Sequence, residues 1–296
     1  MNYLDKYAYS PCEKKINAEI EAIAARVPAQ ESTEVLKKCF SLMDLTTLQT
    51  QDTEAVVKAL VEKANSAVRD YEGYPYPASI CVYPNLAHVV RAERESQELH
   101  VTTVSSCFPS AQSFLPVKVL ECKMAVENGA DEVDIVLALN SFLAGDYEAA
   151  YNEIAAMKAA IDEQAEKEGR KVVLKVILET GLLATPELIA QASFLAMEAG
   201  ADFIKTSTGK VSVNATPMAA YVMCECIKLY NEKTGAKVGF KAAGGISTAA
   251  DALLYYYIGA TILGEEWMNK DYFRFGVSRL GNSLMSAIEQ RPITHF

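Results

Sequence analysis

The alternation of short apolar runs with longer helical patterns constrains the fold of this 296-residue chain more than any other feature. From about residue 41 onward, runs rich in β-branched residues alternate with helical stretches, which is typical of βαβ units around a parallel sheet. Eight such units favour closure into a (β/α)8 TIM barrel; an open doubly wound sheet is the structural alternative. The expected strands are residues 42–46, 79–83, 101–107, 132–138, 172–179, 203–207, 238–243 and 260–263.

Helical patterns separate these strands, most clearly at 52–68, 146–168 and 186–199. The last of these opens with Thr-Pro-Glu and is followed by Gly200, a start and a stop signal. Residues 1–31 lie outside the repeating pattern, so we expect a helical extension, 1–31, and a barrel domain, 32–296. Four apolar residues at helical spacing predict that the extension is an amphipathic helix packed on the barrel or on a partner chain: Ile16, Ile20, Ile23 and Val27.

Composition excludes several classes of function. A net charge of −10 and the absence of a basic patch argue against nucleic acid as a partner. No basic segment precedes an apolar stretch at the start, and no apolar run is long enough for a membrane span, so a cytoplasmic protein is expected. Seven cysteines without a Cys-x-x-Cys pair suit reduced thiols, and three scattered histidines do not form a zinc site. We expect no metal and no cofactor, and a homodimer is possible.

Charged residues inside the expected strands need an explanation, because parallel strands covered on both faces are nearly all apolar. Side chains alternate between the two faces of a strand. In the fourth strand this alternation turns Glu132 and Asp134 toward the barrel interior, and in the fifth and sixth strands it turns Lys175 and Lys205 inward. Three consecutive strands therefore direct Asp134, Lys175 and Lys205 into one interior.

An inward lysine suggests nucleophilic chemistry. Burial penalises the charged ammonium, and a second ammonium nearby favours a free amine, which can form a Schiff base with a carbonyl substrate. Alternatively, each lysine lies at a strand end with its head in solvent, or pairs with Asp134 or Glu179 as structural charge. The convergence of two lysines and an aspartate favours the catalytic interpretation, with Lys175, Lys205 and Asp134 as catalytic residues.

Three glycine-rich turns follow the last strands, at 207–210, 243–247 and 275–279, the third opening the final helix. Barrels bind phosphate there, through loop N–H groups and a helix N-terminus. One Gly-Gly pair indicates only a turn, but three such turns at the same end favour a phosphate site. The expected binding residues are Ser207, Gly209, Lys210, Gly244, Gly245, Gly276 and Ser278.

Several blocks, in order from about residue 40 to 285, resemble the deoxyribose-phosphate aldolase family. The most specific are Leu-Lys-Val-Ile-Leu-Glu-Thr-Gly at 174–181 and Lys-Thr-Ser-Thr-Gly at 205–209. The other matching blocks are 42–48, 81–84, 129–134, 200–210, 213–216 and 240–245.

The resemblance implies a class I aldolase of deoxyribonucleotide catabolism. It would reversibly cleave 2-deoxy-D-ribose 5-phosphate to acetaldehyde and D-glyceraldehyde 3-phosphate, so its partners would be phosphorylated sugars and aldehydes. The resemblance implies that Lys175 forms the Schiff base, that Lys205 favours the free amine, and that Asp134 joins the proton transfers. It adds three further substrate-site residues, Asp44, Cys81 and Thr180. Asp44 orders the site or caps a turn, and Cys81 packs rather than reacts.

The chain departs from the family pattern in the phosphate loops. Ala242 replaces a usual proline, which we expect to loosen a loop, and Arg279 follows Ser278 where many members have a second serine. Two other functions fit the residues. One is a Schiff-base barrel aldolase acting on a keto-acid phosphate, which would need further basic residues. The other is a barrel that only binds sugar phosphates, against which the lysine pair argues.

Overall fold

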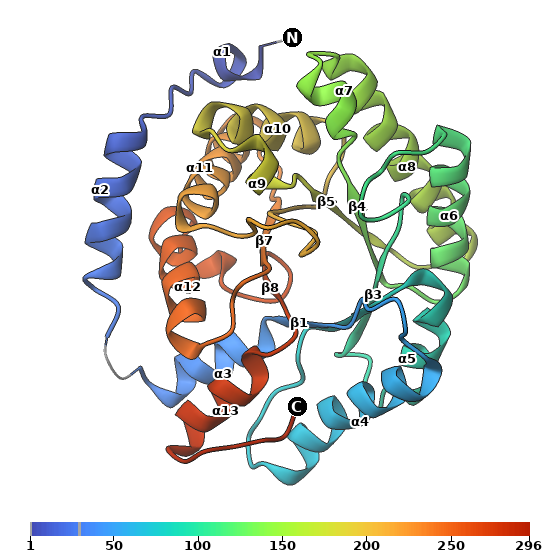
Figure 1. Cartoon of the computed structure of the whole chain (residues 1–296), viewed down its shortest axis with the longest axis vertical. Coiled ribbons are helices and arrows are strands. Elements are labelled where there is room, and N and C mark those ends of the chain that lie inside the picture. The colour runs from blue at the N-terminus through green and yellow to red at the C-terminus, as the bar shows by residue number, and fades with distance from the viewer. Residues whose placement is uncertain (1, 29–30) are drawn as a thin grey trace.

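The computed structural model describes residues 2–28 and 31–296, and its centre is a closed barrel of eight parallel strands (Figure 1). The strands pair in chain order, and β8 pairs back with β1. The expected (β/α)8 barrel is therefore confirmed, and the open sheet is wrong. The strands are β1 Met43–Thr46, β2 Ser79–Val82, β3 His100–Val104, β4 Glu132–Val136, β5 Val173–Ile177, β6 Phe203–Lys205, β7 Gly239–Ala243 and β8 Phe273–Val277.

Helices surround the barrel (Figure 1). Within the described part of the chain, none of them is both long enough and apolar enough to span a membrane. Three precede β1: α1 Tyr3–Tyr7, α2 Glu13–Ala24 and α3 Thr33–Ser41. The others are α4 Glu54–Asp70, η1 Pro84–Leu86, α5 Ala87–Glu93, α6 Leu115–Glu127, α7 Leu139–Leu143, α8 Tyr147–Lys167, α9 Thr180–Leu183, α10 Pro186–Glu198, α11 Pro217–Thr234, α12 Ala249–Leu263, η2 Glu265–Trp267 and α13 Leu280–Glu289.

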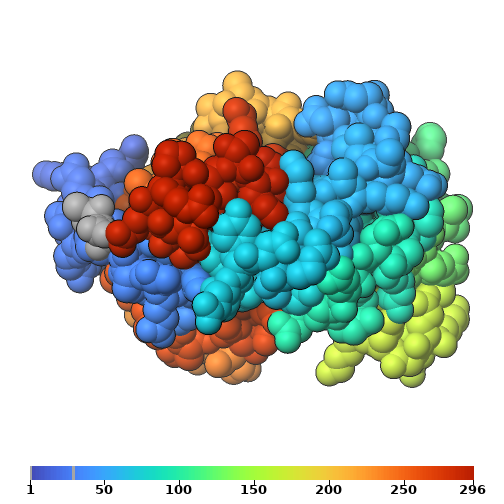
Figure 2. Space-filling model, turned by 90° about the horizontal axis from the view of Figure 1, so that it is seen from below, coloured from blue at the N-terminus to red at the C-terminus, as the bar shows by residue number. Residues whose placement is uncertain are grey.

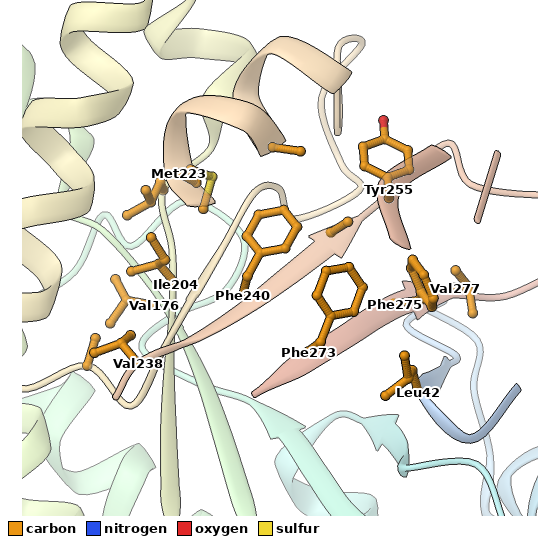
Figure 3. Packing of buried hydrophobic residues seen from close by; sticks show 14 of the residues in the cluster. Leu42, Val176, Ile204, Met223, Val238, Phe240, Tyr255, Phe273, Phe275 and Val277 are labelled. Carbon is orange, nitrogen blue, oxygen red and sulfur yellow. The ribbon is translucent and has the colours of Figure 1, made fainter. Parts of the chain in front are cut away.

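The main core lies between the barrel and these helices. Figure 3 shows Val176, Ile204 and Phe240, from three neighbouring strands, pointing toward the helices, with Met223 of α11 nearby. Phe240 packs on Phe273 of β8 with a ring separation of 5.6 Å. Because side chains alternate along a strand, this packing directs the intervening residues into the barrel.

The eighth strand was predicted wrongly. Residues 260–263 form the last turn of α12, and β8 begins at Phe273. Helix α12 is buried and almost entirely apolar, and a short apolar run in such a helix cannot be distinguished from a strand by its periodicity. Residues 275–277 likewise belong to β8, so the final helix does not open there but begins at Leu280.

The N-terminal extension contains two helices that pack on the outside of the barrel. Tyr7 of α1 is buried and stacks on Phe194 of α10 with ring centroids 4.1 Å apart. Helix α2 lies along α11 and α12 through buried Ile16 and Ile23 (Figure 1). The helical extension is confirmed, whereas its boundary at residue 31 stays a prediction, since residues 29 and 30, like residue 1, lie outside the described residues.

The C-terminal residues are held on the outer helices. The backbone N–H of His295 donates to Asn282 Oδ1 at 2.8 Å, and His295 Nε2 lies 2.7 Å from the carbonyl oxygen of Lys63. Figure 2 shows this segment, in red, beside α4, in cyan.

Candidate active site

Asp134, on β4, is the centre of a buried cluster of charged side chains inside the barrel. Its Oδ1 accepts a hydrogen bond from Lys175 Nζ at 2.9 Å. Its Oδ2 accepts from Lys205 Nζ at 2.8 Å and from Lys241 Nζ at 2.9 Å. Strand register explains the arrangement, because Asp134 pairs with Lys175 and Lys205 pairs with Lys241 on adjacent strands. The structure brings together the three predicted catalytic residues and adds Lys241.

Lys175 lies deep in this cluster and has no exposed surface. Besides Asp134, its Nζ contacts the carboxylate of Glu132 and lies 3.4 Å from Thr102 Oγ1 and 3.9 Å from Asp44 Oδ2. Lys205, in contrast, also lines an open cavity. Of the two lysines, Lys205 is therefore the one that borders the cavity.

A second layer of charge, centred on Arg274 of β8, lies below the lysines. Its guanidinium donates to Asp44 Oδ1 and to Glu132 Oε1, both at 2.6 Å. His100 Nδ1 lies 2.7 Å from the same Glu132 oxygen. Arg274 was not among the predicted site residues, because the eighth strand was expected too early in the chain. The alternation Phe-Arg-Phe at 273–275 was the available signal, since it places a charge between two residues of an apolar row.

The charges in the cluster shift one another's pKa values. Burial raises the pKa of Asp134, but the ammonium groups of Lys175, Lys205 and Lys241 outweigh burial, and the net shift is downward. Burial, together with the neighbouring Lys241, lowers the pKa of Lys205, although Asp134 opposes this. Burial also acts to lower the pKa of Lys241, but Asp134 and Asp44 reverse that effect and raise it. Of these two lysines, Lys205 is the one that burial and its neighbours favour as a free amine.

Asp44, Cys81 and Thr180 lie outside the cavity lining. Asp44 bridges Lys241 and Arg274 in the charged layers, and these cations lower its pKa against the opposing effect of burial. Cys81 is buried among apolar residues, and burial raises its pKa, which disfavours the reactive thiolate. The backbone N–H of Thr180 donates to the carbonyl of Thr206 at 2.9 Å, and the side chain is buried.

A cavity of about 530 Å³ opens above Lys205 at the C-terminal ends of β6, β7, β8 and β1. Three cations, Lys205, Lys210 and Arg279, line it, and none of the described residues in its lining is acidic. In a chain with a net charge of −10, such a wall is suited to an anion. The lining contains all seven residues predicted for phosphate: Ser207, Gly209, Lys210, Gly244, Gly245, Gly276 and Ser278.

Local geometry supports anion binding in this cavity. Ser207 Oγ is buried without a hydrogen-bond partner among the described residues. Gly244 has φ +81°, and a Cβ there would lie 2.7 Å from Asn214 Cβ. A larger residue at this position would therefore clash with Asn214, which also lines the cavity. Ala242, however, lies buried inside strand β7, so the expectation that it loosens a loop is wrong.

Glu179 holds one of the cavity loops in place. It follows β5 in the left-handed region, with φ +56°, where non-glycine residues are strained. Its buried carboxylate accepts hydrogen bonds from the Thr208 hydroxyl and from the Thr208 backbone N–H, the latter at 3.1 Å. Thr208 Oγ1 in turn accepts from the backbone N–H of Lys210 at 3.1 Å. From the sequence, Glu179 was expected only as a structural charge, and its contact with Thr208 was not predicted.

The opposite side of the barrel mouth is apolar. Cys81 and Val104, from β2 and β3, pack with Leu48, and Val136 and Ile177, from β4 and β5, pack with Ala111. Phe108, on the loop after β3, contacts both groups. The mouth therefore has a cationic wall on one side and an apolar wall on the other.

A larger cavity, of about 1250 Å³, lies at the other end of the barrel. Charged residues of both signs line it, and several pair with one another, as Lys158 does with Asp202 at 3.0 Å. Barrel enzymes place their chemistry at the C-terminal ends of the strands, so the smaller cavity is the candidate site.

Comparisons with known proteins point to one family of aldolases. The family model described as DeoC/LacD family aldolase matches residues 39–278. The chain is similar to a Caenorhabditis elegans protein provisionally named deoxyribose-phosphate aldolase, with 43% identity over 247 residues, covering 83% of this chain and 78% of the relative.

Solved structures are similar as well. The structure of deoxyribose phosphate aldolase from Aeropyrum pernix, described as a tetramer, matches with 25% identity and a TM-score of 0.66, covering 93% of this chain and 98% of the other. A Coccidioides immitis structure matches in fold, with 23% identity and a TM-score of 0.69, covering 95% and 98%. With the family model spanning most of its length, the chain belongs to the DeoC/LacD family of aldolases.

Proposed function

We propose that this chain is a class I aldolase that reversibly cleaves 2-deoxy-D-ribose 5-phosphate to acetaldehyde and D-glyceraldehyde 3-phosphate in deoxyribonucleotide catabolism. The observation that carries the proposal is the pair of lysines on Asp134, which lies beside a cationic cavity. Family membership supports the aldol chemistry, and the names of the relatives supply the substrate. The free cysteines along the described chain support a reducing, cytoplasmic setting.

Lys175 is the proposed nucleophile. Its amine adds to the C1 aldehyde and loses water to give an iminium, which accepts the electron pair of the C2–C3 bond as that bond breaks. The C3 hydroxyl gives up its proton, and glyceraldehyde 3-phosphate leaves. The remaining enamine is protonated at C2, and water releases acetaldehyde. Lys205, with its lowered pKa, and Asp134 serve these proton transfers.

The two walls of the mouth orient the substrate. The phosphate lies in the cationic cavity, held by the glycine-rich loops, Ser207, Lys210 and Ser278. The apolar wall, with Val136 and Ile177, then faces the two carbons that leave as acetaldehyde. A barrel that only bound sugar phosphates would have no need of two buried lysines on one aspartate.

Product analysis tests the reaction. Purified enzyme incubated with 2-deoxyribose 5-phosphate should release acetaldehyde and glyceraldehyde 3-phosphate in equal amounts, each followed by a coupled dehydrogenase assay. A preparation that is folded and yields neither product contradicts the proposed substrate. Cleavage of a keto-acid phosphate in the same assay would instead favour that alternative.

Arg279→Ser should weaken substrate binding without slowing the chemistry. Arg279 lines the cavity on the phosphate side, so its removal should raise KM for the phosphorylated substrate about threefold to tenfold, with kcat unchanged. Unphosphorylated 2-deoxyribose should be cleaved by the variant and the wild type at the same rate. Arg26→Ser, at an exposed position on the N-terminal segment, is the control. An unchanged KM in Arg279→Ser would exclude the residue from phosphate recognition.

A further inference from the structure

His100 lies between the buried charge cluster and the solvent at the N-terminal end of the barrel. It is the first residue of β3, so it is at the end of the barrel opposite the cavity that Lys205 borders. Its side chain is 30% exposed, whereas the carboxylate of Glu132, which it contacts, is completely buried. The imidazole can therefore exchange protons with solvent while it contacts a group inside the barrel.

Glu132 is the shared partner of His100 and Lys175. Its Oε1 lies 2.7 Å from His100 Nδ1 and accepts a hydrogen bond from Arg274 at 2.6 Å. Its Oε2 contacts Lys175 Nζ and accepts a hydrogen bond from Thr102 Oγ1 at 3.0 Å. A single carboxylate thus separates the imidazole from the amine of the proposed nucleophile.

The carboxylates around Lys175 oppose its role as a nucleophile. Its amine contacts Glu132 and Asp134, with Asp44 Oδ2 3.9 Å away, and an ammonium is favoured beside carboxylates. A Schiff base, however, forms from the free amine. A positive charge on the other side of Glu132 offsets the charge of that carboxylate and so disfavours a further positive charge at Lys175.

We propose that His100 is a positioning residue for the aldol reaction: as an imidazolium paired with Glu132, it favours the free amine of Lys175. This inference rests on the proposed function, in which Lys175 is the nucleophile. The separation of 2.7 Å is typical of a hydrogen bond from a cationic nitrogen to a carboxylate. Arg274 supplies a constant part of the compensating charge, and His100 supplies the part that changes with pH.

Glu132 is ionised at neutral pH. Burial acts to raise its pKa, but the charges of Arg274 and Lys175 and the hydrogen bond with His100 outweigh burial, and the pKa lies well below its ordinary value. Of the two cations beside Glu132 Oε1, His100 is the one that can lose its proton in the range of an assay, since an arginine stays charged.

Two further charged residues lie near His100. Lys270, on the segment before β8, donates at 3.4 Å to the carbonyl oxygen two residues before the imidazole. Asp131, which precedes β4, accepts a hydrogen bond at 3.0 Å from the backbone N–H of the residue that follows His100. On β2 the residue paired with His100 is Ser79, which carries no charge. These groups are unchanged when His100 is substituted, so a change in pH dependence reports the imidazole itself.

The pH profile of kcat/KM tests this role. In His100→Gln the side chain can still donate a hydrogen bond to Glu132 but carries no charge, so the ammonium form of Lys175 should persist to higher pH. The acid limb of the profile should shift upward by about one pH unit, a loss of about tenfold in kcat/KM on that limb. The two profiles should meet in alkaline solution, where the amine is free in both enzymes. His100→Arg, which keeps a positive charge at every pH, should restore the wild-type limb.

His88→Gln is the matched control, because His88 is a surface histidine, 51% exposed, that lies 3.6 Å from Glu54. This variant should keep the wild-type profile, and each variant should keep the wild-type melting transition. A His100→Gln profile that coincides with the wild type, or a loss of equal size at every pH, overturns the inference. A shift that His100→Arg does not reverse overturns it as well.

Borohydride trapping separates this inference from the proposed function. With substrate at neutral pH, the wild type should be trapped at Lys175, and trapping of His100→Gln should be slower by the same factor as kcat/KM. Trapping at the wild-type rate in this variant would contradict the role of His100 and leave Lys175 as the nucleophile. A wild type that is not trapped at all would instead refute the proposed function.

Discussion

Replacing Lys175 with methionine is expected to lower kcat/KM for 2-deoxyribose 5-phosphate by about 10⁴-fold or more, because no other group can replace the iminium as electron sink. Methionine keeps the length and most of the volume of the lysine side chain. It removes the charge that lies between Asp134 and Glu132, so the variant has to be shown to be folded by its melting transition.

Borohydride trapping assigns the nucleophile directly. Substrate and borohydride together should add mass to the peptide that contains Lys175, and this adduct should be absent from Lys175→Met. Lys171→Met, at an exposed lysine just before β5, is the control and should retain both the adduct and the rate. An adduct on Lys205 or Lys241 instead would show that this lysine, and not Lys175, is the nucleophile.

Replacing Asp134 with asparagine is expected to reduce the free energy of unfolding by about 3–5 kcal/mol at pH 7, because three buried ammonium groups lose their shared counter-ion. The neighbouring cations hold the pKa of Asp134 below that of an unfolded aspartate. A carboxylate of this kind stabilises the fold above the unfolded pKa of about 3.9, and the stabilisation is lost as the pH falls toward the folded value. The difference between wild type and variant should therefore shrink below about pH 4.

Urea denaturation at a series of pH values measures this difference. Asp162→Asn is the control, since that carboxylate is 54% exposed and forms an ion pair with Lys158 on the surface. Its effect should stay below about 0.5 kcal/mol at every pH. A stability difference for Asp134→Asn that is small at pH 7, or that grows in acid, would contradict the assigned role of the three ammonium groups.

Periodicity predicted most of the interior of the barrel. The alternation of apolar and charged residues placed Asp134, Lys175 and Lys205 on the inner face, and in the structure both lysines donate hydrogen bonds to Asp134. The same rule would have found Arg274, but a buried apolar helix was taken for the last strand and concealed it. The inner faces of strands were thus predictable wherever the strand itself was identified.

Contacts between loops were not predictable in this way. The hydrogen bonds from Thr208 to Glu179 depend on the left-handed backbone of Glu179 and on the arrangement of two neighbouring loops. Neither leaves a periodic pattern in the sequence. At Ala242 a loop was expected where there is none. The family resemblance suggested a loop at this position, but strand β7 continues through it.

The complete burial of Lys175 has a consequence for selectivity in a cell that contains many reactive aldehydes. A nucleophilic amine open to solvent would react with any of them and be consumed as dead-end adducts. Here the amine is fully buried, and the neighbouring cavity is lined by three cations, which favours carbonyl compounds that carry an anionic group. With Lys175 as the proposed nucleophile, its depth would protect the amine from inactivation as well as serve catalysis.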